Sequence, residues 1–139
     1  MFTVEKNIQL TKEWCDQIAA VYISCGRGTR YLWKEIEKSF ENTDYYLIAF
    51  DEQKRAVGVL RAFTDDVYST WLAELMVAKP FRNQGIGTAL LRRFSKDFEH
   101  TTIYGTPLAD AAPFYAPFGI KKKEEMAVCS RPLVHAEVE

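Results

Sequence analysis

The sequence predicts an α/β protein of the mixed α+β type, with a central mixed but largely antiparallel sheet flanked by helices in three layers. Three strand-like runs at residues 45–50, 56–63 and 68–77 are separated by short polar turns, which predicts an antiparallel meander. An amphipathic helical segment then leads to a β-branched run at residues 101–105, which predicts one crossover connection. With 139 residues, 47% of them hydrophobic, the chain suits a single domain over residues 1–139 whose last several residues form a tail.

The segment before the meander predicts a short strand at residues 2–4 followed by two helices. Thr11 is a candidate N-cap for the first helix, whose apolar side chains recur at helical spacing. Gly26 and Gly28 are expected to end it. Residues 31–40 predict a second helix with one apolar and one charged face.

The segment after the meander predicts a long helix, a short helix and a last strand. The long helix begins near Gly85. Asp110 is a candidate N-cap for a helix over residues 111–118, and residues 126–130 are strand-like. The apolar stripe expected on the long helix consists of Ile86, Leu90, Leu91, Phe94 and Phe98.

Composition excludes several classes of protein. A net charge of −1, from 18 basic and 19 acidic residues, argues against a dedicated nucleic-acid binder. The three cysteines, Cys15, Cys25 and Cys129, are widely spaced, which argues against a disulfide framework or a metal site and favours the reducing cytoplasm. No apolar run reaches the length of a membrane span, so no membrane partner is expected. An exposed sheet edge near the last strand would suit a homodimer.

The most informative motif is a strand that runs through a turn into a glycine-containing helix start, at residues 75–91. The first amides of a helix lack intrahelical acceptors, and the helix dipole adds positive potential, so this geometry suits a phosphate. A Rossmann fingerprint is excluded because Leu90 stands where a third small residue belongs. A P-loop is excluded because Thr88 follows Gly87 directly, without a lysine.

Arg82-Asn83-Gln84-Gly85-Ile86-Gly87 after Leu75-Met76-Val77 resembles the pyrophosphate loop of the GNAT superfamily of acyl-CoA-dependent N-acetyltransferases. Downstream, Ala111-Ala112-Pro113-Phe114-Tyr115-Ala116-Pro117-Phe118-Gly119-Ile120 resembles a second motif of that superfamily. The resemblance implies acetyl-CoA as cosubstrate. It also implies the cofactor-binding positions Met76, Val77, Arg82, Gln84, Gly85, Ile86, Gly87 and Thr88.

Two departures from the superfamily pattern affect details. Asn83 stands where glycine is common, but asparagine tolerates the positive φ that such a loop requires. Leu108 stands where asparagine is common, which removes one polar contact expected for the pantetheine arm.

Glu74 is the candidate that takes the proton of the acceptor amine, directly or through water. Its expected neighbours on the same strand face are Leu72 and Met76. The alternative is a structural carboxylate paired with an arginine such as Arg61. Asp65 and Asp66 are competing bases, although turn chemistry alone explains aspartates at that point.

Tyr115 is the position at which the resemblance places the general acid. A phenol is protonated at neutral pH and can donate to the departing thiolate of CoA. The alternative is an aromatic side chain that only packs beside Phe114 and Phe118. Cys129 is expected in the core, without a role as nucleophile.

The leading hypothesis is therefore an N-acetyltransferase that moves the acetyl group of acetyl-CoA to a primary amine of a small molecule, by direct attack in a ternary complex. A peptide amine is a further acceptor class. The alternatives are a non-catalytic acyl-CoA-binding or sensing module and a nucleotide-binding regulator. The sequence leaves the acceptor open, although Asp65, Asp66 and Glu74 are compatible with a cationic amine.

Overall fold

The computed structural model describes residues 1–134, so the tail expected at the end of the chain lies outside the described residues. One five-stranded sheet has the order β1-β2-β3-β4-β5, antiparallel except for the parallel pair β4–β5. The predicted mixed, largely antiparallel sheet is confirmed. The strands are β1 (Thr3–Lys6), β2 (Tyr45–Phe50), β3 (Ala56–Thr64), β4 (Ser69–Val77) and β5 (Thr102–Gly105).

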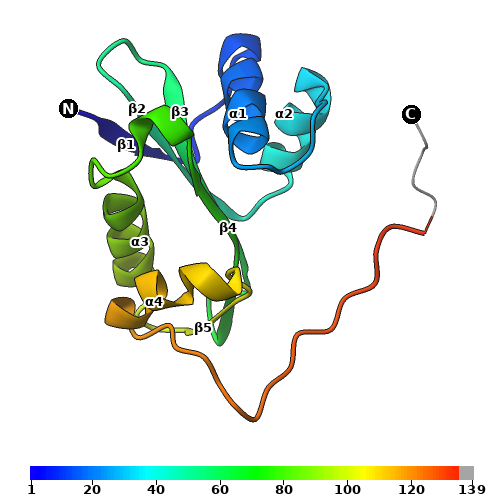
Figure 1. Ribbon diagram of the computed structural model, residues 1–139, viewed down its shortest axis with the longest axis vertical. Helices are drawn as coiled ribbons and strands as arrows, with labels where there is room; N and C mark the ends of the chain where they lie inside the picture. Colours follow the sequence, from blue (N-terminus) through cyan, green and yellow to red (C-terminus); the bar gives the residue numbers. More distant parts are fainter. Residues whose placement is uncertain (135–139) are drawn as a thin grey trace.

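Helices cover both faces of the sheet (Figure 1). The first pair, α1 (Lys12–Ser24) and α2 (Trp33–Glu41), packs on one face around Ile18 and Phe40. The second pair, α3 (Ile86–Asp97) and α4 (Ala112–Tyr115), packs on the other face around Leu90 and Phe94. Within residues 1–134, no helix is long and apolar enough to span a membrane.

The helix signals read from the sequence are largely confirmed. The Trp14 amide donates to Thr11 Oγ1 at 3.1 Å, which makes Thr11 the N-cap of α1. All five residues of the stripe predicted on α3 are buried. The helix α2 begins at Trp33, two residues later than expected, because Leu32 has an extended backbone.

The predicted helix over residues 111–118 is wrong as a single element. The chain forms a 3₁₀ turn at Ala109–Ala111, the short α4, and a second 3₁₀ turn at Ala116–Phe118. Pro117 lacks the amide that a continuous helix would bond to the Pro113 carbonyl, whereas Pro113 lies in the first turn, where proline is tolerated. Asp110 lies within the first 3₁₀ turn and caps no helix through its side chain.

The predicted strand at residues 126–130 is also wrong. Residues 121–134 form no strand and lead away from the helices and strands (Figure 1). Cys129, expected in the core, is exposed. Strand propensity is a local preference, whereas a strand requires a neighbour that supplies hydrogen bonds.

A β-bulge at Ala73 changes the facing of β4. Arg61 pairs with Glu74 and Ala62 pairs with Leu72, so Ala73 is one extra residue in β4. The expected shared face of Leu72 and Glu74 is therefore wrong: Leu72 packs in the α3-side core, whereas Glu74 contacts α1 on the opposite face. The bulge instead places Trp71, whose partner is Phe63, on the face of Glu74.

Candidate active site

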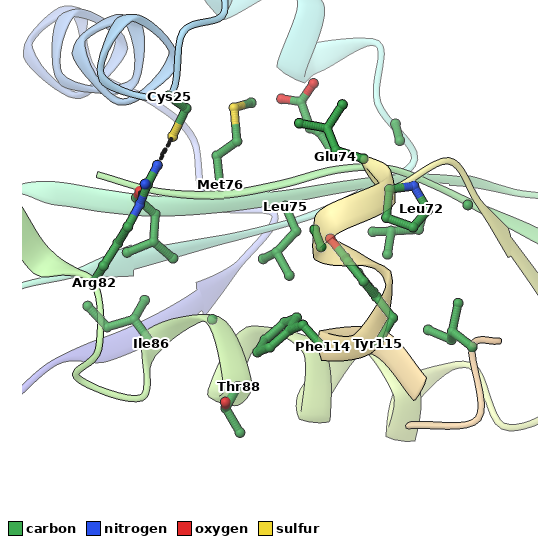
Figure 2. Close-up of a pocket in the computed structure, with 18 of the residues that line it drawn as sticks. Cys25, Leu72, Glu74, Leu75, Met76, Arg82, Ile86, Thr88, Phe114 and Tyr115 are labelled. Atoms are coloured by element: carbon green, nitrogen blue, oxygen red, sulfur yellow. Dashed lines mark hydrogen bonds between the residues drawn. The ribbon is translucent and has the colours of Figure 1, made fainter. Parts of the chain in front are cut away.

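The candidate site lies where β4 and β5 part. The parallel pairing of these strands ends at Leu72 and Gly105, so the rest of β4 is paired only with β3. The opening is a cavity of about 550 Å³ lined by the second half of β4, the loop before α3, and α4 (Figure 2). Both motifs singled out in the sequence therefore meet at one cavity.

The register of β3 and β4 determines which peptide groups face this cavity. The Ala78 amide donates to the Val57 carbonyl at 2.9 Å, so by alternation the main chain of Met76 is directed to β3 and that of Leu75 and Val77 is directed away from it. The Val77 carbonyl already accepts hydrogen bonds from Cys25 Sγ at 3.4 Å and Arg82 Nε at 3.1 Å. Met76 is one of the residues that line the cavity, and it also packs in the core on the α1 side.

The loop before α3 has the backbone of an anion cradle. Asn83 and Gly85 have φ of 65° and 85°, in the left-handed region that asparagine and glycine tolerate best. The first helical bond runs from the Ala89 amide to the Gly85 carbonyl at 3.0 Å. The amides of Ile86, Gly87 and Thr88 therefore precede the first bonded turn, as an N-terminal anion site requires.

The predicted loop residues do not all line the cavity. Gln84 instead borders a separate depression beside the N-terminus. Arg82 folds back toward α1, where its Nη2 donates to Cys25 Sγ at 3.3 Å (Figure 2). Of the predicted positions, Arg82, Gly85, Ile86, Gly87 and Thr88 line the cavity, and Asn83 lines it with them.

Glu74 is held from two sides. Arg61 Nη2 donates to Glu74 Oε1 at 2.9 Å, and the Tyr22 hydroxyl donates to Glu74 Oε2. The ion pair is largely buried, with side-chain exposures of 17% for Arg61 and 11% for Glu74. Burial and the adjacent Glu74 carboxylate raise the pKa of Tyr22 well above its usual range, so this phenol is a donor to the carboxylate. The pairing with Arg61 weighed as an alternative is present, and it holds the carboxylate at the cavity wall.

Tyr115 lies on the other side of β4 from Glu74. Its hydroxyl points from α4 toward β4, whereas the Glu74 carboxylate lies beyond the strand (Figure 2). Within residues 1–134 the Tyr115 hydroxyl has no hydrogen-bond partner. Burial raises the pKa of Tyr115, and the charge of Arg27 opposes that shift only in part. A protonated, unengaged phenol therefore faces the cavity.

The competing aspartates have structural partners. Asp65 Oδ1 accepts the amides of Val67, Tyr68 and Ser69, which closes the β3–β4 turn and lowers the pKa of Asp65. Asp66 Oδ1 lies 2.8 Å from His100 Nε2. Neither aspartate lines the cavity.

Two residues of this site, Tyr22 and Cys25, carry no signal in the sequence that points to it. Tyr22 reads as one more apolar position of α1, and Cys25 reads as an isolated cysteine. Only the packing of α1 across β4 brings Tyr22 to Glu74 and Cys25 to Val77. Among residues 1–134 no cluster of three or more His, Cys, Asp and Glu side chains could hold a metal ion.

A family model described as an acetyltransferase (GNAT) domain matches residues 42–121 of this chain. The chain belongs to the GNAT acetyltransferase family. The match includes the β3–β4 hairpin, the loop before α3, and α4, which together form most of the cavity. No curated protein matches the chain significantly in sequence.

Solved structures of acetyltransferases share the fold. A probable acetyltransferase from meticillin-resistant Staphylococcus aureus has a TM-score of 0.77 at 18% identity, covering 94% of this chain and 98% of its own. A GNAT family acetyltransferase from Streptococcus pneumoniae has a TM-score of 0.72 at 19% identity, with coverages of 94% and 99%. An aminoglycoside acetyltransferase from an uncultured soil sample, in complex with sisomicin, has a TM-score of 0.67 at 14% identity, with coverages of 95% and 96%.

Proposed function

We propose that this GNAT protein is an N-acetyltransferase that transfers the acetyl group of acetyl-CoA to a primary amine of a small molecule. The observation that carries the proposal is the Tyr115 hydroxyl, which has no partner within residues 1–134 and faces the cavity between the α3 cradle and Glu74. A proton donor in this position is what a departing thiolate requires. A module that only bound acyl-CoA would need the cradle but not this phenol.

The reaction is a direct attack in a ternary complex. The amine nitrogen forms a bond to the carbonyl carbon of the thioester, and the carbon–sulfur bond breaks as the tetrahedral intermediate collapses. The Tyr115 hydroxyl gives its proton to the sulfur, so that CoA leaves as a thiol. The second proton that the newly bonded nitrogen loses then restores the phenol, through water. The amides of Ile86, Gly87 and Thr88 hold the pyrophosphate, and the open side of β4 holds the pantetheine arm.

Glu74 takes the proton that the amine must lose. An amine with a pKa near 10.4 carries a proton at pH 7, and removing it costs about 5 kcal/mol. The anchoring of Glu74 by Arg61 and Tyr22 suits a fixed acceptor of that proton, reached through a water molecule. Asp65 and Asp66 cannot take this proton, because they lie outside the cavity, where they contact the Ser69 amide and His100.

The experiment that tests the proposal is mass-spectrometric detection of acetylated product from purified protein, acetyl-CoA and a panel of small amines and peptides. Mass detection is insensitive to the three cysteine thiols. Acetylated product from any amine supports the transferase. Saturable acetyl-CoA binding without product from any amine would overturn the proposal in favour of a sensing module.

A further inference from the structure

The charges around the cavity argue against a polycationic acceptor. Among the described residues that line the cavity, Glu74 is the one carboxylate, whereas Arg27 and Arg82 are both cationic. The charge of Glu74 is also balanced by Arg61. Because a second or third ammonium would meet no free carboxylate in this wall, the site suits an acceptor with a single positive charge.

An aromatic surface lies beside Glu74 on the same face of the sheet. Phe63, Trp71 and Tyr104 come from three neighbouring strands and are paired across them, Phe63 with Trp71 and Trp71 with Tyr104. The rings of Trp71 and Tyr104 are stacked, with centroids 6.0 Å apart and an interplanar angle of 22°. Phe63 is 41% exposed and Trp71 is 43% exposed. We call these three residues the aromatic floor.

The aromatic floor is continuous with the candidate site. Arg61 lies at its border: its guanidinium is 5.9 Å from the Phe63 ring centroid and binds Glu74 directly. The same guanidinium donates to Ser39 and Thr43, at the end of α2, which marks where the helices stop covering this face. The bulge at Ala73 creates the continuity, because simple alternation would put Trp71 and Glu74 on opposite faces.

We infer that the acceptor is a monocationic primary amine carrying an aromatic ring on a short chain, with its nitrogen at Glu74 and its ring stacked on Trp71. This inference rests on the proposed function. Trp71 and Glu74 are three residue steps apart along β4, a span of at most about 10 Å, which a ring and a chain of a few carbons can bridge. Ring stacking on an exposed aromatic pair adds affinity beyond the area that it buries.

The test compares acceptors and variants by mass-detected product formation. Phenethylamine and tryptamine represent the inferred class, hexylamine lacks the ring, and 1,5-diaminopentane and kanamycin represent polycations. We expect kcat/KM for the aromatic amines to exceed that for the polycations at least about tenfold. Trp71→Ala should raise KM for phenethylamine about tenfold, while KM for hexylamine and for acetyl-CoA stays within about threefold.

The matched control is Tyr68→Ala, which removes an exposed aromatic ring from the adjoining turn outside the aromatic floor. It should leave every KM unchanged. Trp71→Leu and Tyr104→Leu, checked by circular dichroism, separate loss of stacking from loss of fold. A preference for polycations, or an unchanged KM for phenethylamine in folded Trp71 variants, would overturn the inference while leaving the transferase intact.

Calorimetric titration of the CoA-loaded protein with the same amines separates the two proposals. Tighter binding of aromatic amines, lost in Trp71→Ala, supports the aromatic floor even if no amine is acetylated, and the proposed function alone then fails. Absence of that preference overturns the inference.

Discussion

Two buried tyrosines in this molecule each donate to a carboxylate, one on each face of the sheet. Tyr45 donates to Asp97 Oδ2 at 2.7 Å on the α3 side, and Tyr22 donates to Glu74 on the α1 side. In both cases burial and the carboxylate raise the pKa of the phenol. The carboxylates differ in what surrounds them: Asp97 is at the end of α3 with a half-exposed arginine, whereas Glu74 lies at the cavity with a largely buried one.

Position in the fold, more than the chemistry of the pair, separates a structural contact from a functional one. Tyr45 and Asp97 join the end of α3 to the sheet. The contact of Tyr22 and Arg61 with Glu74 is equivalent, but it lies beside the half of β4 that is paired only with β3. Tyr115 completes the contrast, because it is a buried phenol without a carboxylate partner within residues 1–134.

The largest expected effect is that of Tyr115→Phe on acetyl transfer. Loss of a general acid lowers kcat by about 10²- to 10⁴-fold, because the thiolate must then leave without a proton. The matched control, Tyr45→Phe, removes the hydroxyl of another buried tyrosine, one that does not line the cavity, and should leave kcat unchanged. Steady-state kinetics with a saturating amine measure both. A full rate in Tyr115→Phe would remove the acid role.

Arg61→Leu is expected to destabilise the protein by about 3 kcal/mol, because Glu74 is left as a buried charge without its cation. The control is Arg93→Leu, which removes the half-exposed partner of Asp97 and should cost less than about 1 kcal/mol. Urea unfolding at pH 7 measures both losses. Equal losses would mean that the Arg61–Glu74 pair is as solvated as the surface pair. Restored stability in an Arg61→Leu, Glu74→Leu double variant would confirm the origin of the cost.

Glu74→Gln is expected to lower kcat/KM about 100-fold, since the amide keeps the contact with Arg61 but cannot take a proton. Asp97→Asn is the matched change on the other face and should leave kcat/KM unaltered. The pH dependence of kcat/KM separates a proton acceptor from a merely structural residue. If Glu74 only held its neighbours in place, the variant would lower the rate without changing the shape of the pH profile.

Local signals explain what the sequence predicted well. The Thr11 cap, the stripe on α3 and the glycine turn before it depend on residues close together in the chain, and all are present in the structure. The strand at residues 126–130 failed because its propensity came without a partner. The helix over residues 111–118 failed for a different reason: Pro117 ends α4 after one turn, although Tyr115 still faces the cavity.

The surroundings of Glu74 could not be predicted because they depend on a single inserted residue. Ala73 has no sequence signature that separates a bulge from a regular strand position, yet it decides which face carries Glu74 and Trp71. Tyr22 comes from a helix 52 positions away in the chain. Contacts of that kind follow from how helices cross the sheet, which periodicity alone does not determine.

The smallest expected effect concerns the stability of the fold at high pH, to which Tyr22 on one face of the sheet and Tyr45 on the other should contribute in the same way. The folded pKa of Tyr22 and of Tyr45 is raised by burial and by the neighbouring carboxylate, above an unfolded value near 10. The unfolded chain therefore releases these protons first, so stability is fully present below about pH 10 and falls as the pH rises further. Tyr22→Phe and Tyr45→Phe should each flatten the decline of the urea midpoint between about pH 9.5 and 11, whereas Tyr68→Phe, on an exposed turn, should not. If the urea midpoint declined with pH in parallel for all three variants, neither buried phenol would resist ionisation. The Tyr22–Glu74 and Tyr45–Asp97 contacts would then be alike in geometry but not in their effect on stability.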